Sequence, residues 1–181
     1  MARLRSQCIL AQLTSSVVVM GVAGSGKSTL GAAVAERMSW PMIEGDDFHS
    51  DANKAKMQAG VALTDADREG WLRTLARELE RHPGGAVLTC SALKRSYRDL
   101  LRAASTGLGF VFLDIAEAEA LRRVRGRGPH FFSPQLMQSQ FDALEVPVDE
   151  PGVLRLDARL PLESLVDRTI AWLTARNGQG E

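Results

Sequence analysis

Short apolar runs alternate along the chain with longer stretches in which apolar residues recur every three or four positions. The runs are rich in β-branched side chains and bounded by glycine, proline or polar residues, as expected of buried strands. Because these strands are apolar throughout, the pattern favours a parallel sheet covered on both faces by helices. The five predicted strands are residues 15–20, 41–45, 84–90, 109–115 and 152–158.

The longer stretches predict amphipathic helices between the strands. Thr64 and Asp67 form a capping-box-like start for one of them, and Ser133 before Pro134 is typical of the start of another. The apolar positions are Leu30, Val34 and Met38 in residues 27–38; Trp71, Leu72, Leu75 and Leu79; Tyr97, Leu100, Leu101 and Ala104; Leu136, Met137, Phe141 and Leu144; and Leu165, Val166, Ile170 and Leu173 in a helix over about 162–176. The alternation predicts a three-layer α/β/α fold.

Composition narrows the class of protein. At 181 residues, with 45% hydrophobic and 24% charged side chains, the chain fits one globular domain, placed at 15–181 after a tail of 1–14. Its 22 basic and 22 acidic residues cancel, which argues against nucleic acid or an anionic membrane as a partner. No apolar stretch nears the roughly 20 residues that span a bilayer, and the N-terminus lacks a secretory-signal pattern. Because Cys8 and Cys90 make no disulfide framework, we expect a cytoplasmic protein.

A glycine-rich segment, GVAGSGKSTLG, joins the first predicted strand to the first predicted helix. Gly21, Gly26, Lys27 and Ser28 satisfy the P-loop pattern G-x-x-x-x-G-K-[ST] in its proper context. Backbone N–H groups of such a loop cradle phosphates, with Lys27 reaching the β- and γ-phosphates and the Ser28 hydroxyl ligating Mg²⁺. The sequence therefore predicts a nucleoside triphosphate site formed by Gly21, Val22, Ala23, Gly24, Ser25, Gly26, Lys27, Ser28 and Thr29.

P-loops also occur in GTPases and motor ATPases, but neither class fits well. The stretch DREG at 67–70 matches D-x-x-G, yet it lies inside a predicted helix rather than after a strand. No N-K-x-D motif for guanine follows, because Asn53 and Lys54 precede Ala55 and Lys56. The third predicted strand ends in VLTCSALK, without the acidic pair of a Walker B strand. A small-molecule kinase remains.

Chemically active side chains concentrate after the second predicted strand, in EGDDFHSDANKAKMQAG. Ligands collect at the carboxyl edge of such sheets, and a kinase needs a carboxylate beside the acceptor hydroxyl. Asp46 or Asp47 is therefore the candidate base or Mg²⁺ organiser. His49 is a candidate hydrogen-bond donor to the substrate, and Lys56 is a candidate for neutralising an anionic one.

Two further basic clusters follow. Lys94, Arg95 and Arg98 come directly after the third predicted strand, and three cations near a P-loop suggest that the acceptor is an acid. Four arginines, at 122, 123, 125 and 127, alternate with glycines before a helix. This second cluster fits a lid over 122–147 that closes on the phosphates and excludes water. A basic helix terminus that compensates its own dipole fits the same residues.

The chain resembles the gluconate kinases, in the shikimate-kinase-like branch of P-loop small-molecule kinases, from about residue 16 to the last helix. The motifs that carry the resemblance are GVAGSGKST, GDDFH, NKAKMQAGVALTDADREGWL, CSALKRSYRDLLR, GRGPHFF and QFDALEVP. The resemblance implies a P-loop kinase fold with a helical lid. It also implies transfer of the ATP γ-phosphate, with Mg²⁺, to the 6-hydroxyl of D-gluconate, giving 6-phosphogluconate, and a homodimer.

Residue roles follow from the resemblance by position. It implies that Asp46 lies at the acceptor hydroxyl and acts with Lys27 and Arg127 in catalysis. His49, Lys56 and Arg68, in a substrate-binding segment over 46–83, would hold gluconate together with Lys94. Arg123 and Arg127 match lid arginines that contact the nucleotide, and His130, Phe131 and Phe132 match the lid signature. The sequence departs from the family at Ser50, where proline is usual.

Two other functions remain as alternatives. One is a kinase for another small acid, such as shikimate, although the acid-and-arginine pattern of shikimate kinases after the second strand is not found here. The other is a nucleotide-binding switch or adaptor, which needs a sensor of the γ-phosphate and a partner surface rather than an acceptor pocket.

Overall fold

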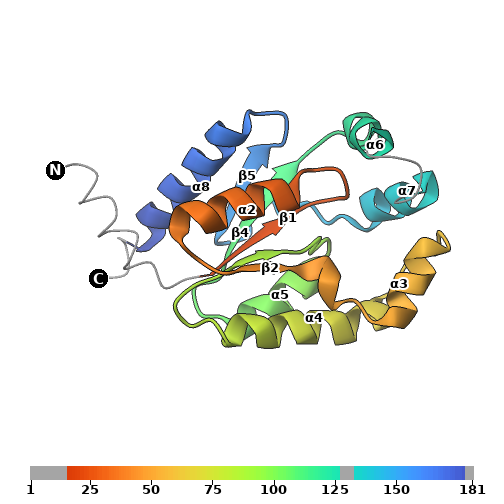
Figure 1. Ribbon diagram of the computed structural model, residues 1–181, viewed down its shortest axis with the longest axis horizontal. Helices are drawn as coiled ribbons and strands as arrows, with labels where there is room; N and C mark the ends of the chain where they lie inside the picture. Colours follow the sequence, from red (N-terminus) through yellow and green to blue (C-terminus); the bar gives the residue numbers. More distant parts are fainter. Residues whose placement is uncertain (1–15, 127–132, 178–181) are drawn as a thin grey trace.

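A computed structural model describes residues 16–126 and 133–177 and shows a parallel sheet between two layers of helices (Figure 1). The strands are β1 (Val17–Met20), β2 (Met42–Glu44), β3 (Val87–Thr89), β4 (Gly109–Asp114) and β5 (Val153–Asp157), in the order β2-β3-β1-β4-β5. Each lies inside a slightly longer predicted range, and every neighbouring pair is parallel. The predicted α/β class and five-stranded parallel sheet are confirmed. The expected tail of 1–14 lies outside the described residues.

The helices cover both faces of the sheet. They are α2 (Lys27–Met38), α3 (Asp51–Gln58), α4 (Asp65–Glu80), α5 (Arg95–Ala104), α6 (Glu117–Arg125), α7 (Pro134–Ala143) and α8 (Leu162–Asn177), with a 3₁₀ turn η1 (Gly45–Phe48). One apolar core joins the sheet to α2 and α8, and a second joins its other face to α4 and α5. Among the described residues, no helix combines the length and the apolarity needed to cross a membrane.

The central strand explains why the strands are apolar without alternation. In β1, Val17 and Val19 belong to the core under α2 and α8, whereas Val18 and Met20 belong to the core under α4 and α5. All four side chains are fully buried. Since neither face meets water, no position in this strand favours a polar residue.

Local capping sets where several helices begin. Thr64 and Asp67 form a reciprocal capping box at α4, and the Ser133 hydroxyl accepts from the Leu136 N–H at α7, as predicted. Ser50, which replaces the usual proline, accepts from the Asn53 N–H at 3.2 Å and so caps α3.

The hydrophobic pattern does not predict α3 or α6. Each is short and polar, and the only buried side chain recorded in the helix is Asn53 in α3 and Ala120 in α6. A helix without an apolar stripe leaves no periodic signal in the sequence.

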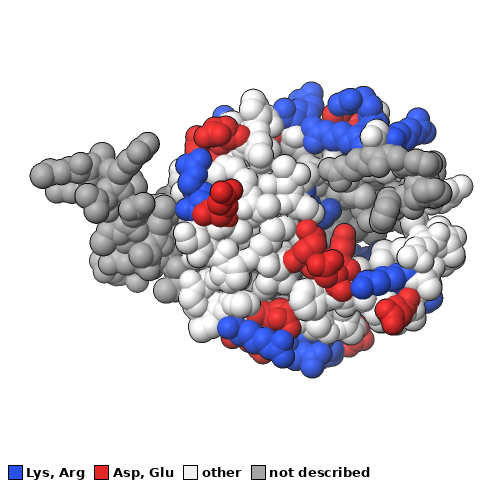
Figure 2. Space-filling view, viewed as in Figure 1, with Lys and Arg blue, Asp and Glu red and all other residues white. Residues whose placement is uncertain are grey.

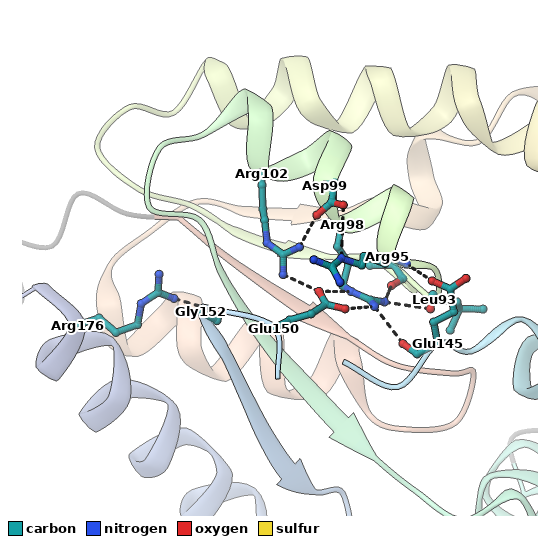
Figure 3. A network of polar contacts seen from close by, with 10 residues as sticks. Leu93, Arg95, Arg98, Asp99, Arg102, Glu145, Glu150, Gly152 and Arg176 are labelled. Carbon is teal, nitrogen blue, oxygen red and sulfur yellow. Dashed lines mark hydrogen bonds and ion pairs between the residues drawn. The ribbon is translucent and has the colours of Figure 1, made fainter. Parts of the chain in front are cut away.

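A buried ion pair ties α5 to the segment before β5 (Figure 3). Arg98 is fully buried, and its Nε donates to Oε2 of Glu150 at 2.9 Å while Nη2 donates to the other carboxylate oxygen. Its remaining donors go to the carbonyl oxygens of Ala92, Leu93 and Glu145, so all five N–H groups of the guanidinium are used. Arg98 is therefore a structural residue, and its predicted role in a substrate-facing cation cluster is wrong.

We expect Glu150→Gln to lower the free energy of unfolding by about 3 kcal/mol or more at pH 7, because it leaves the Arg98 charge buried without its carboxylate. Hydrogen bonds from Arg98 lower the pKa of Glu150 from 4.5 to about 2. The wild-type advantage is therefore fully present above pH 4.5 and is lost as the pH falls toward 2. Urea unfolding of both proteins across this range measures the difference, with Glu69→Gln in the exposed pair with Arg73 as the control. A difference that stays constant in acid would contradict this account.

Candidate active site

The P-loop joins β1 to the N-terminus of α2. Gly24 and Gly26 have φ values of 77° and 100°, in the left-handed region that only glycine adopts readily. Gly26 is the N-cap of α2 and offers no side chain to bond the first helical N–H groups, while Ser28 and Thr29 are exposed. The Nζ of Lys27 donates to the carbonyl oxygen of Val22 at 3.1 Å, folded back across the loop. This arrangement suits a phosphate chain.

A cavity of about 430 Å³ adjoins the P-loop on the side of α6 and α8. Gly24 fits closely there, since a Cβ at this position would lie 2.8 Å from the carbonyl oxygen of Ala120. Arg123 enters the lining with its Nε on Glu119 at 2.8 Å and its Nη2 on the Ala158 carbonyl oxygen at 3.0 Å. The lining residues are Gly24, Ser25, Gly26, Thr29, Leu30, Arg122, Arg123, Gly126, Ala158, Leu160, Leu162 and Leu165.

Asp46 is placed by the contacts of its neighbour Gly45. A Cβ on Gly45 would overlap with the carbonyl oxygen of Thr89, so only glycine lets η1 lie this close to β3. The Gly45 N–H donates to the Thr89 hydroxyl at 3.3 Å, and the Trp71 indole donates to the Gly45 carbonyl oxygen at 2.7 Å. Trp71 thus connects α4 to the backbone that carries Asp46, a role that the sequence pattern, which marks it as a core residue, does not reveal.

The Asp46 carboxylate lies 4.0 Å from the Nε2 of the buried His49. The turn that carries Asp46 adjoins the carboxyl end of β3, because Glu44 pairs with Thr89 in the sheet. The P-loop adjoins the same end, since the Gly21 N–H donates to the Ser91 carbonyl oxygen at 3.3 Å. The backbone carbonyl oxygen of Asp47 accepts from the Nζ of Lys54 at 3.1 Å.

His49 is buried against Trp71. The two rings stack with centroids 4.2 Å apart and planes at 17°. Its Nε2 lies 4.0 Å from the Asp46 carboxylate, while Nδ1 is buried without a hydrogen-bond partner among the described residues. Burial lowers the pKa of His49, opposed by Asp46 and assisted by Arg68. The ring is a neutral group with an unused polar atom.

The other predicted substrate cations are held in place by partners. The Nζ of Lys56 lies 2.6 Å from Asp67, whose pKa falls to about 2 through hydrogen bonds from Lys56 and Thr64. The Nζ of Lys94 lies 2.7 Å from Asp65. Arg68 donates to the Leu63 carbonyl oxygen at 2.7 Å. Lys94 follows β3, and its bond to Asp65 brings the first turn of α4, which carries Arg68, to the same end of the sheet as Asp46. Lys56 lies at the margin, beside Asp67.

Several predicted residues do not join this group. Arg95 is exposed, and its Nε lies 3.8 Å from the Asp99 carboxylate. Neither Arg95 nor Arg98 therefore belongs to the predicted cation cluster. Arg127 and the lid signature at 130–132 lie outside the described residues. Gln140 of α7, the first residue of the QFDALEVP motif but one given no role by the sequence, accepts a hydrogen bond from the P-loop N–H of Ala23 at 2.7 Å.

Charge is segregated around the site although the chain is neutral overall. Figure 2 shows acidic residues exposed where β2 passes into η1, and basic residues along the edge formed by α6. In Figure 1, α6 and α7 lie on one side of this end of the sheet and α3 on the other. The arrangement can hold a polyanion on the α6 side and present a carboxylate from the η1 side.

Comparisons with known proteins point to one family. A family model described as an AAA domain matches residues 17–151. The gluconokinase of Gluconobacter oxydans is 41% identical over 164 residues, which are 89% of this chain and 92% of the relative. The thermoresistant gluconokinase of Escherichia coli is 40% identical over 84% of this chain and 90% of its own. The solved structure of a gluconokinase from Sinorhizobium meliloti matches with a TM-score of 0.83 at 43% identity, covering 90% of this chain and 93% of that one.

We expect the His49 ring to titrate below its usual pKa of 6.5, because burial disfavours the charged form. The ring is then neutral at pH 7 and becomes charged only in more acidic solution. An NMR titration of the imidazole resonances measures this, and His49→Phe, which can keep the stack on Trp71, identifies them. A midpoint at or above 6.5 would contradict the burial argument.

Proposed function

The chain belongs to the gluconokinase family, and from this premise we propose how its own residues carry out the family's reaction. The enzyme uses ATP to phosphorylate D-gluconate to 6-phospho-D-gluconate. The observation that carries the assignment of residues is that three segments meet at the carboxyl end of β3. The Gly21 N–H of the P-loop donates to the Ser91 carbonyl oxygen at 3.3 Å, the strand before Asp46 pairs with β3 at Thr89, and Lys94 follows the same strand at the start of α5. A phosphate-binding lysine, a carboxylate and a cation for an acidic substrate thus share one edge of the sheet.

ATP occupies the P-loop and the cavity beside it in this proposal. The amides of Gly24 and of residues 26–29 bind the phosphates, and the apolar part of the cavity, around Leu160 and Leu162, receives the adenosine. Arg123, already in the cavity lining, contacts the phosphates, and Arg127 is proposed to do the same from the lid over 122–147. Leu160, between β5 and α8, and Leu162, the first residue of α8, lie in no recognisable motif, which is why the sequence does not reveal them.

The reaction is an in-line transfer between the two halves of the site. The 6-hydroxyl of gluconate gives its proton to the Asp46 carboxylate as its oxygen forms a bond to the γ-phosphorus. The bond from that phosphorus to the bridging oxygen breaks, and ADP leaves with the electron pair. Lys27 and the lid arginines compensate the negative charge on the transferred group.

Gluconate requires both donors and acceptors, because it combines a carboxylate with several hydroxyl groups. Lys56 with Asp67 and Lys94 with Asp65 offer both kinds of group within one ion pair. Arg68 offers charge to the carboxylate. His49, whose Nε2 lies 4.0 Å from the Asp46 carboxylate, is a further polar contact for a hydroxyl.

Three finer features belong to the same proposal. Mg²⁺ fits the donor set, because it commonly combines few protein oxygens with substrate phosphates, and the exposed Ser28 hydroxyl lies at the start of α2. When bound, the ion neutralises charge on the β- and γ-phosphate oxygens. A homodimer is carried over from the family resemblance, and a cytoplasmic location is proposed because the reaction consumes ATP.

Acceptor-dependent ADP release tests the function. We expect turnover with D-gluconate and Mg·ATP, and little with neutral glucose, because the site presents cations for a carboxylate. We also expect little turnover with shikimate, because the chain belongs to the gluconokinase family. Lys27→Ala should abolish turnover, since the γ-phosphate loses its charge compensation. Turnover only with another acid would identify a different kinase, and nucleotide binding without acceptor-dependent turnover would identify a switch.

The two neighbouring aspartates give a matched pair of variants. We expect Asp46→Asn to lower kcat by about 10²–10⁴-fold, the usual range for a positioned base, with the ATP dissociation constant nearly unchanged. Asp47→Asn should keep most of the activity, because the carboxylate that lies beside the buried His49 is that of Asp46. Steady-state kinetics of both variants decide the matter, and a larger loss in Asp47→Asn would reverse the assignment.

A further inference from the structure

Helix α7 contacts all three segments that form the site. At its start, Ser133 lies beside the turn after α3, where a Cβ on Gly60 would be 3.6 Å from the Ser133 hydroxyl. In its second half, Gln140 accepts from the P-loop N–H of Ala23 at 2.7 Å. Just after its end, Glu145 bonds to the turn between β3 and α5. The helix therefore bridges the nucleotide side and the acceptor side.

The C-terminal end of this bridge is firmly attached. The Glu145 N–H donates to the Leu93 carbonyl oxygen at 2.9 Å, and its carboxylate accepts from the Arg95 N–H at 2.6 Å. That carboxylate satisfies the first N–H of α5, whose N-cap Lys94 makes no side-chain cap. Arg98 adds a third hydrogen bond between α5 and the end of α7 by donating to the Glu145 carbonyl oxygen at 3.0 Å (Figure 3).

The inner face of α7 carries Gln140 toward the P-loop. Leu136 and Met137, one turn earlier on the helix, are both buried, and Met137 belongs to the core under α2 and α8. Gln140 itself is half-buried, and its amide oxygen is the atom that meets the P-loop. Gln138 lies on the outer face, exposed, with its amide on Asp142 at 2.8 Å. Two glutamines on one helix thus have opposite surroundings.

We propose that Gln140 is a positioning residue that holds the P-loop at Ala23 and thereby sets the γ-phosphate at the right distance from the acceptor hydroxyl. This inference rests on the proposed function above. Because the Ala23 N–H is committed to Gln140 and the Ser25 N–H donates to the Val22 carbonyl oxygen at 3.3 Å, phosphate binding falls to the amides of Gly24 and of residues 26–29. Glu145, just after α7, bonds to the turn that carries Lys94, so the bond from Ala23 to Gln140 fixes the P-loop backbone relative to that turn. The transfer step is sensitive to such placement, since a shift of about 1 Å can lower a rate by about 100-fold.

Three variants separate positioning from packing. Gln140→Met has nearly the same shape without the acceptor, and we expect its kcat to fall about 10- to 100-fold, with the KM for gluconate and the affinity for an ATP analogue changed little. Gln140→Glu keeps an acceptor for the Ala23 N–H, so it should recover most of the lost kcat, while its charge weakens ATP binding. Gln138→Met is the control on the exposed face and should match the wild type. A wild-type kcat in Gln140→Met, or equal losses of kcat in Gln140→Met and Gln140→Glu, would overturn the proposal.

A second measurement needs no acceptor and so does not depend on which acid is phosphorylated. Amide hydrogen exchange of the P-loop peptide, residues 21–27, should be faster in Gln140→Met than in the wild type and unchanged in Gln138→Met. Unchanged exchange in Gln140→Met would overturn the proposal even if gluconate is the substrate. Failure of the wild type to phosphorylate gluconate would instead remove the proposed function and leave the exchange result to decide the role of Gln140.

Discussion

The buried guanidinium of Arg98 holds the turn after β3, and the arrangement of the site depends on that turn. Its Nη1 donates to the carbonyl oxygens of both Ala92 and Leu93, and Ala92 has a φ of 44°, which is costly for any residue with a Cβ. The turn keeps this conformation because Arg98 and Glu150 are themselves fully satisfied (Figure 3). A charge buried in this way adds little net stability, but it fixes one geometry.

Each part of the site contacts this same stretch of backbone. The P-loop meets it where the Gly21 N–H donates to the Ser91 carbonyl oxygen at 3.3 Å. The turn that carries Asp46 meets it through Gly45 and Thr89, and α7 meets it through Glu145. The P-loop, the turn that carries Asp46 and helix α7 are thereby all positioned against the turn after β3. In-line transfer requires such fixed placement of nucleotide and acceptor. The cations nearby are held by carboxylates or carbonyl oxygens, so little reorganisation is needed when a polyanion binds.

Sequence reasoning was most successful where the signal is local. The P-loop, the five strands, the capping box of Thr64 and Asp67 and the cap at Ser133 all depend on spacings of a few residues, and the structure shows each of them. It failed for the cation cluster after β3, because three basic residues in one turn and a half of helix point in different directions. Lys94 meets Asp65, Arg95 faces solvent, and Arg98 turns into the core.

The sequence by itself therefore determined the class of fold, the phosphate cradle and the family, since glycine spacing, β-branched runs and motif order are properties of the chain alone. Only the tertiary structure decided which charged residues serve the site and which serve the fold. The partners that settle this lie far apart in the sequence: Glu150 is 52 residues from Arg98, and Gln140 is 117 residues from Ala23. Burial and pairing arise when the sheet brings such segments together, and no local pattern records that meeting.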